Sequence, residues 1–375
     1  MTKDVTLPDS PLTRIPNVSL MRAGSGFILA GYDGSLVRWG HLTLDGALTE
    51  EAGFELAQPI VLGPVFGATM KATPGDQLVA IVVTNSATVS GGYDITAKVQ
   101  TTGVPTAAAP VVLATLPAGT DPSLVQIAAG AASSGNVGFV AWGTRVPGIS
   151  PTHLLLPADA VTAATPSKLY DDPPANVPNW DCLATTGGTT GLGYSVVTPD
   201  LQGTTDLVAN EVSETGAATR LTYQFRVAVA SCQVVSAPGP AGTYVMALET
   251  SNAIDFAMYY PPVIAGGDGS VSTKGPVLSA SSFGDPLSMP HPVWAGPATG
   301  GDISIGLART AGVQIFRFTF DAIPHGAPLT LRSEEGQTGP VASWVDLDTV
   351  YVTYTDQAKT SPPSVRRYFM RVDSP

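Results

Sequence analysis

Short apolar runs, each preceded by a polar or glycine-rich bend, recur along the whole chain. Seven such runs can be aligned with one another. They read "GFILAGYD" from Gly26, "QLVAIVVTN" from Gln77, "NVGFVAWG" from Asn136, "GLGYSVVTP" from Gly191, "TYVMALETS" from Thr243, "DISIGLART" from Asp302 and "TVYVTYTD" from Thr349. Their spacing of about 47 to 60 residues is typical of a repeat with four strands in each unit.

The segments around each run predict the remaining strands. The sixth copy reads "HPVWAGPA", "DISIGLART", "GVQIFRFTF" and "APLTLRSEE", and the second reads "PVFGATMKA", "QLVAIVVTN", "YDITAKVQTT" and "APVVLATLP". The turn "SATVSGG" inside the second copy is glycine-rich, as a hairpin requires. The pattern predicts antiparallel units at residues 17–58, 59–118, 119–176, 177–227, 228–285, 286–338 and 339–375, the last completed by residues 1–12.

Several predicted strands are apolar on both faces, as in "LVAIVV" and "IFRFTF". Such strands need burial on both sides, which sheets packed face to face around a ring provide. With this architecture the chain resembles the β-propeller superfamily over its whole length. It matches no particular family, because the WD dipeptide, the Asp-box and complete kelch motifs are missing.

The interpretation is therefore an all-β, seven-bladed β-propeller of four-stranded antiparallel blades in one domain, residues 1–375. The last unit lacks a fourth strand, and "DVTLPD" near the N-terminus is unassigned. If that segment pairs with the last blade, it closes the ring and covers an exposed sheet edge. Two tandem β-sandwiches or a β-helix remain alternatives.

The composition supports many short strands joined by turns. Hydrophobic residues make up 44% and charged residues only 13%, with 40 Gly and 33 Pro. The net charge is −12 and the basic residues are scattered, so nucleic acid is not an expected partner. No apolar run approaches the roughly 20 residues of a membrane-spanning helix. We expect a monomeric domain.

The N-terminal segment "MTKDVTLPDSPL" has no apolar signal-peptide region. The low lysine and high Ser, Thr and Gly content nevertheless favours a secreted, periplasmic or cell-surface protein, with a cytoplasmic one as the alternative. Cys182 and Cys232 are the only cysteines, and they fall at matching positions in the first strands of the fourth and fifth units. A disulfide between them is predicted, with two buried free thiols as the alternative.

No catalytic motif stands out. The four histidines are not spaced as zinc ligands, and the nucleophile elbow, the P-loop and the dinucleotide fingerprint are absent. His41 and His153 fall in predicted third strands, and His291 and His325 in turns. No cofactor and no metal site are predicted. Calcium remains an option, because carboxylates cluster in "DLD" and "YDDPPANVPNWD", but the EF-hand spacing is missing.

Tryptophans recur near the first strands of the fourth, sixth and seventh units. They either pack in the wedge between neighbouring sheets or stack on a ligand at the channel mouth. The long loops before these strands lead us to expect one candidate ligand-binding face, made of Asp171, Asp172, Trp180, Asp181, His291, Trp294, Trp344 and Asp346.

Three function classes remain open. The first is a non-catalytic binding or scaffold propeller of an exported, bacterial-type protein that recognises a glycan, a peptide or a protein partner through loops on one face. The second is a hydrolase or lyase acting on a sugar or small molecule at the channel mouth. The third is a subunit of a larger assembly, with apolar contacts such as Phe54 and Tyr260. Fold alone does not choose among them.

Overall fold

The structure is a computed structural model. It describes residues 2–23, 25–69, 75–131, 137–144, 152–157, 167–168, 182–186, 191–197, 205–212, 218–225, 231–236, 244–249, 253–259, 271–272, 277–279, 292–297, 303–309, 312–318, 327, 329–330, 342–346, 349–358 and 364–373. Side chains are described in residues 4–21, 25–67, 75–123, 125–127, 129, 142, 327, 351–355 and 366–371.

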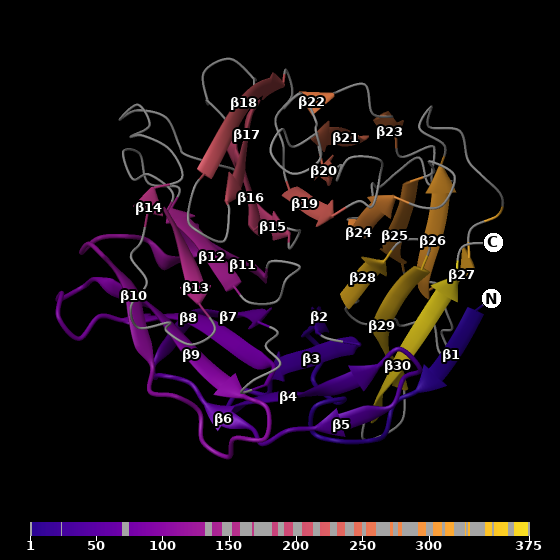
Figure 1. Cartoon of the computed structure of the whole chain (residues 1–375), viewed down its shortest axis with the longest axis horizontal. Coiled ribbons are helices and arrows are strands. Elements are labelled where there is room, and N and C mark those ends of the chain that lie inside the picture. Colours follow the sequence, from indigo (N-terminus) through magenta and orange to yellow (C-terminus); the bar gives the residue numbers. More distant parts are fainter. Residues whose placement is uncertain are drawn as a thin grey trace. The chain divides into compact units, whose positions relative to one another are not determined.

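The described part of the chain forms seven antiparallel sheets, and its one helical element is the short 3₁₀ turn η1 (Pro122–Leu124) (Figure 1). The first sheet has the order β2 (Val18–Ala23), β3 (Gly26–Tyr32), β4 (Leu36–Thr43), β5 (Leu48–Glu50), with β6 (Phe54–Glu55) also on β4. The second contains β7 (Ile60–Thr69), β8 (Gln77–Asn85), β9 (Tyr93–Thr101) and β10 (Val111–Leu116).

The middle sheets follow the same strand order. The third contains β11 (Val125–Ala131), β12 (Val137–Thr144), β13 (Thr152–Pro157) and β14 (Ser167–Lys168). The fourth contains β15 (Cys182–Thr186), β16 (Gly191–Val197), β17 (Thr205–Val212) and β18 (Ala218–Phe225). The fifth has the order β19 (Ser231–Ser236), β20 (Tyr244–Glu249), β21 (Ala253–Tyr259), β22 (Val271–Ser272), with β23 (Val277–Ser279) also on β21.

The last two sheets complete the series. The sixth contains β24 (Pro292–Pro297), β25 (Ile303–Arg309), β26 (Gly312–Phe318) and β27 (Leu329–Thr330). The seventh has the order β28 (Ala342–Asp346), β29 (Thr349–Ala358), β30 (Ser364–Asp373), β1 (Thr2–Thr6). The N-terminal strand thus pairs with the C-terminal strand, as predicted, with Thr2 opposite Val372 and Thr6 opposite Tyr368.

The all-β antiparallel class is confirmed, and each sheet lies within one of the predicted unit ranges. The prediction of four strands in every unit is wrong for the first and fifth sheets, in which β6 and β23 add a fifth strand on the third strand. His41 and His153 lie in the third strands β4 and β13, also as predicted. His325, Tyr260 and the predicted loops around them lie outside the described residues. A single ring of seven blades, and a single domain, stay predictions.

Contacts divide the chain into two compact units. One comprises residues 1–33, 39–50 and 230–375, and the other residues 34–38 and 51–229. In the first unit, β19 lies beside β24, β24 beside β28, and β28 beside β2. In the second, β7 lies beside β11, and β11 beside β15. Within each unit, therefore, neighbouring sheets meet through their first strands.

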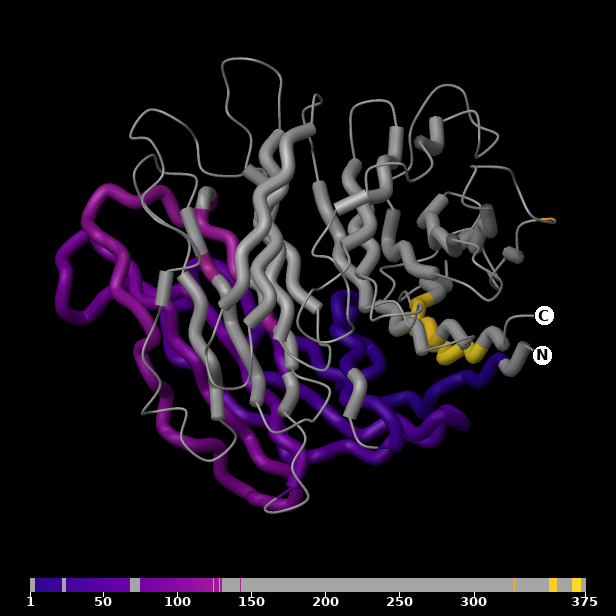
Figure 2. The backbone as a smooth tube through the Cα atoms, turned by 45° about the horizontal axis from the view of Figure 1, so that its top comes forward, coloured from indigo at the N-terminus to yellow at the C-terminus, as the bar shows by residue number. Residues whose placement is uncertain are grey.

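Burial explains why these runs form strands. In β8, every residue from Gln77 to Thr84 is buried, so both faces of the strand are covered. Val79, Ile81 and Val83 share a core with residues of β9 to β12, and the alternate residues are buried on the opposite face. The predicted two-sided burial of "LVAIVV" is thus confirmed. Figure 2 shows the backbone of this region as a meander.

Candidate functional site

The predicted ligand-binding residues are only partly covered by the structure. Five of them lie outside the described residues: Asp171, Asp172, Trp180, Asp181 and His291. The other three lie in described strands, Trp294 in β24 and Trp344 and Asp346 in β28, and their side chains are outside the described part. What the structure gives for these three is their place in the strand register.

The two tryptophans are third residues of adjacent first strands. Trp294 pairs with Gly306 across β24 and β25, and Trp344 pairs with Tyr351 across β28 and β29. Directly paired residues lie on the same face of a sheet, and Tyr351 belongs to a hydrophobic core. Trp344 therefore holds the register position opposite a core residue, and its predicted ligand contact stays a prediction.

Asp346 occupies a different end of its sheet from the one expected. It is the last residue of β28 and pairs with Thr349 across the turn into β29. The loops before the first strands enter at the opposite end, which we call the entry end of a sheet. The predicted grouping of Asp346 with His291 stays a prediction, because His291 lies outside the described residues.

The cysteines lie in first strands, as predicted. Cys182 is the first residue of β15 and Cys232 the second of β19. Their side chains are outside the described part, and the disulfide stays a prediction. The expectation for Phe54 is wrong. Its side chain is only 6% exposed and lies beneath the Lys98 ammonium, which is 5.8 Å from the ring centroid, so it is not a surface contact.

The best-described entry end belongs to β28 and β2. Because β28, β29, β30 and β1 alternate in direction, β1 ends where β28 begins. The loop Leu7–Asn17 then connects β1 to β2, and Arg367 of β30 donates hydrogen bonds to the carbonyls of Ile15 and Pro16, directly before β2. Both first strands therefore start at the same end, with this connecting loop between them.

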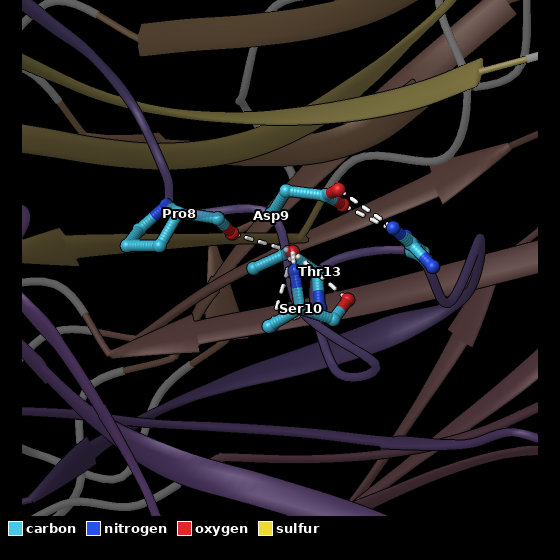
Figure 3. A network of polar contacts seen from close by, with 5 residues as sticks. Pro8, Asp9, Ser10 and Thr13 are labelled. Carbon is cyan, nitrogen blue, oxygen red and sulfur yellow. Dashed lines mark hydrogen bonds and ion pairs between the residues drawn. The ribbon is translucent and has the colours of Figure 1, made fainter.

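The connecting loop contains a capped turn (Figure 3). The Ser10 hydroxyl accepts a hydrogen bond from the Thr13 backbone N–H at 3.2 Å, and the Thr13 hydroxyl accepts one from the Ser10 N–H at 3.0 Å. The Thr13 hydroxyl also lies 2.8 Å from the Pro8 carbonyl, to which it donates. This reciprocal bonding is that of a helix N-terminal capping box, with Pro11 in the favoured first position.

Buried and exposed residues alternate around this turn. Leu7, Leu12, Thr13 and Ile15 are buried, with Leu12 fully so, and the three apolar ones enter the core that contains Phe27, Tyr351 and Phe369. The remaining residues, apart from the half-buried Ser10, are exposed: Pro8, Asp9, Pro11, Arg14, Pro16 and Asn17. The loop is thus anchored from inside and presents its other side to solvent.

Asp9 and Arg14 form a bidentate ion pair on the exposed side. Arg14 Nε lies 2.7 Å from Asp9 Oδ1 and Nη2 lies 2.6 Å from Oδ2. The hydrogen bond from Arg14 lowers the pKa of Asp9 below its ordinary value of 3.8, and the same bond raises the pKa of Arg14. Both groups are charged at neutral pH and are held in one geometry.

Arg367 closes the inner side of the loop. Its guanidinium is 1% exposed and also donates to the Thr353 hydroxyl at 3.3 Å, while its Nε has no hydrogen-bond partner among the described residues. Burial lowers the pKa of Arg367 to about 10, so the group remains charged at neutral pH. Sequence reasoning missed this residue, although its alternation with Phe369 in "SVRRYFMRV" places it on the core face.

The described part of the chain contains no group of three or more His, Cys, Asp or Glu side chains able to hold a metal ion. It also contains no helix that is long and apolar enough to cross a membrane. What the entry end of β28 and β2 offers is a fixed loop with a paired carboxylate and guanidinium and three exposed prolines.

No protein-family model matches the chain, and no curated protein matches it. Solved structures do match. A puromycin hydrolase aligns over 96% of this chain and 54% of its own, with 13% identity and a TM-score of 0.52. A prolyl endopeptidase aligns over 95% and 50%, with 12% identity and a TM-score of 0.52. The six-bladed lectin of Aleuria aurantia aligns over 85% and 98%, with 13% identity and a TM-score of 0.47.

The chain therefore has a β-propeller fold. It spans about half the length of the hydrolase and the endopeptidase that it matches. At this level of identity the likeness concerns the fold alone, and the chemistry of the hydrolase and the endopeptidase belongs to those proteins.

Proposed function

We propose that this chain is a binding propeller that recognises a glycan, a peptide or a protein through the loops at the entry ends of its sheets. The observation that supports it is the loop Leu7–Asn17, which is fixed by a capping box, buried apolar residues and Arg367 while its outer side is exposed. A loop already held in one conformation loses little entropy on binding, which favours affinity.

The ring belongs to the same proposal. Seven sheets arranged as a ring, closed by β1 in the last sheet, would bring seven sets of loops to one face. The pairing of β1 with β30 supports this closure. In such a ring, Asp171, Asp172, Trp180, Asp181, His291 and Trp294 would border the same face as the loop Leu7–Asn17.

The test compares ligand binding at the two ends of the first sheet. In a thermal-shift screen with soluble saccharides and peptides, a ligand that binds the folded state raises the melting temperature. The double variant Asp9→Ala/Arg14→Ala removes the exposed charges and keeps the buried anchors, so the shift should shrink. Asp45→Ala alters the turn at the opposite end, between β4 and β5, and should leave the shift unchanged. A shift that is equal in all three proteins would refute the role of this face.

An exported location is part of the proposal, with the cytoplasm as the alternative. The predicted Cys182–Cys232 disulfide links the question to stability, because it would close a loop of roughly 50 residues and contribute about 4 kcal/mol. Adding a reductant in the same screen should lower the melting temperature strongly. An unchanged melting temperature would favour two free thiols and the cytoplasmic alternative.

The alternative function is a hydrolase or lyase at the channel mouth. It depends on the sequence grouping of carboxylates with His291 and Trp294, which could support acid–base chemistry only within hydrogen-bonding reach of a substrate. Turnover of any saccharide or peptide that raises the melting temperature would favour it. A ligand recovered unaltered after long incubation would favour the binding propeller.

A further inference from the structure

The outer strand of the second sheet, β10, is uncharged, unlike the other outer strands of five or more residues in the described part. Between Lys98 and Asp121 the chain carries no charged residue, and this stretch includes all of β10. We call residues 104–116 the β10 edge. Its outer side has no paired strand among the described residues, because β10 ends the strand order of its sheet.

The β10 edge carries two exposed valine side chains. Val112 is 54% exposed and Val104 is 42% exposed. The ladder with β9 is irregular between Val112 and Ala114, so Leu113 enters the core beneath the sheet while Val112 faces outward. The bulge thus leaves an apolar side chain on the outside of an uncharged strand.

The β10 edge is fastened at both ends. At one end, the buried Gln100 side-chain amide donates to the carbonyls of Val104 and Thr101, and the Ala108 N–H donates to the Val99 carbonyl at 2.8 Å. At the other end, the Thr115 hydroxyl donates to Asp94 Oδ1 at 2.7 Å. The two ends of the β10 edge are therefore held in place before any partner arrives, which lowers the entropic cost of pairing.

The other two outer strands of five or more residues in the described part carry charges: β1 contains Lys3 and Asp4, and β18 contains Arg220. Charged residues on an outer strand are a common protection against pairing with another chain. The β10 edge lacks that protection, although its bulge shortens the regular stretches to Val111–Val112 and Ala114–Leu116.

We propose that the β10 edge pairs with the β10 edge of a second copy of this chain, antiparallel and about a two-fold axis. Each copy carries a net charge of −12, so two copies repel one another and can approach closely only where the chain is uncharged. A two-fold contact uses the same surface on both partners, and here that surface brings no charge from either side. Because the bulge shortens the stretch that can pair regularly, we expect this dimer to dissociate on dilution.

This proposal departs from the monomeric domain expected from the sequence, and it does not depend on the proposed ligand-binding function. It predicts that sedimentation equilibrium over a concentration series shows a mass rising from that of one chain to that of two. A mass equal to one chain at every concentration would overturn the proposal.

Three variants locate the contact. Val112→Lys places a charge on the edge and should hold the protein at the mass of one chain. Val112→Thr keeps an uncharged β-branched side chain and should still dimerise. Thr49→Lys adds the same charge to the exposed outer strand β5 and should dimerise like the unaltered protein. Circular dichroism and the melting temperature confirm that each variant is folded.

The variants also separate this contact from other forms of association. If Val112→Lys dimerises as well as the unaltered protein, the dimer uses another surface and the proposal fails. If Thr49→Lys abolishes the dimer as fully as Val112→Lys, general charge repulsion is responsible and the β10 edge is not the contact.

Discussion

The core beneath β8 and the core between β3 and β29 are equally well buried, but they gather their residues from different distances along the chain. The first, which we call the hairpin core, contains Val79, Ile81, Val83, Ile95, Ala97, Val99, Leu113, Leu116, Val125 and Trp142. The second, the terminal core, contains Leu7, Leu12, Ile15, Leu20, Phe27, Leu29, Leu42, Tyr351 and Phe369. Consecutive hairpins build the first, and the two ends of the chain build the second.

Side-chain chemistry follows this difference. The hairpin core is almost entirely aliphatic, whereas the terminal core joins the rings of Phe27, Tyr351 and Phe369, with 4.8 Å between the centroids of Phe27 and Tyr351. Beside it, the buried Arg367 bonds two carbonyls that lie 352 and 351 positions earlier in the chain. Strands that are close in the sequence need only apolar burial. Joining distant segments costs more loop-closure entropy, and in the terminal core the directional hydrogen bonds of Arg367 add to the apolar burial.

The largest effect is expected in the hairpin core. Ile81 is fully buried in the middle of β8, and Ile81→Ala leaves a cavity between strands that cannot collapse easily. The free energy of unfolding, measured by denaturant titration, should fall by about 4 kcal/mol. Val104→Ala shortens an exposed side chain in the loop before β10 and should change the free energy of unfolding by less than about 0.5 kcal/mol.

The two variants test whether packing alone holds this core. Equal losses in Ile81→Ala and Val104→Ala would contradict the buried position of Ile81. A loss in Ile81→Ala accompanied by unchanged hydrogen-exchange protection of β8 and β9 would contradict the view that these strands unfold as one region.

The second effect concerns the terminal core. Arg367→Met keeps the length of the side chain but leaves the carbonyls of Ile15 and Pro16 without their donor, at a cost of roughly 3 kcal/mol. The loss is smaller than for Ile81 because the variant also relieves the burial of a charge. Arg366→Met, at the adjacent exposed position, is the matched control and should stay within about 0.5 kcal/mol.

Hydrogen exchange distinguishes this variant from a general loss of stability. The Leu7 N–H bonds the Arg367 carbonyl at 2.9 Å and belongs to the segment that Arg367 fastens. In Arg367→Met, protection at Leu7 and in β1 should fall before that of β8. Uniform loss across both cores would mean that Arg367 does not act specifically on the N-terminal segment.

The two cores were also unequally predictable from the sequence. Apolar runs such as "QLVAIVVTN" and the glycine-rich turn "SATVSGG" specify hairpins within a few residues, and the strands of the second sheet appeared where expected. The pairing of β1 with β30 was predicted only because one unit lacked a strand. Nothing local shows that Leu12 and Ile15 enter the terminal core, since both lie in a proline-rich connection.

The candidate site was less predictable than the fold. Residue type marked Trp344 and Asp346 as candidates, but strand register decides their surroundings, and it places one opposite a core residue and the other away from the entry end. Phe54 was expected at the surface because sequence does not show that Lys98 of β9 lies over it. The fixed loop Leu7–Asn17 depends on Arg367, which follows it by most of the chain length.

The smallest effect is expected on the exposed side of that loop, where the Asp9–Arg14 pair lies outside either core. The bond from Arg14 lowers the pKa of Asp9 in the folded protein, so the pair stabilises above the ordinary value of 3.8, and this contribution disappears as the pH falls through the lowered pKa. Asp9→Asn should therefore be slightly less stable than the unaltered protein near about pH 6 and equal to it near about pH 2. Denaturant titrations at both pH values, with Glu50→Gln as an exposed control, measure this difference. Since salt screens exposed charges, the difference at the higher pH should shrink with ionic strength, whereas the loss in Ile81→Ala should persist. A difference that is independent of pH would mean that the Asp9 carboxylate contributes through something other than its charge.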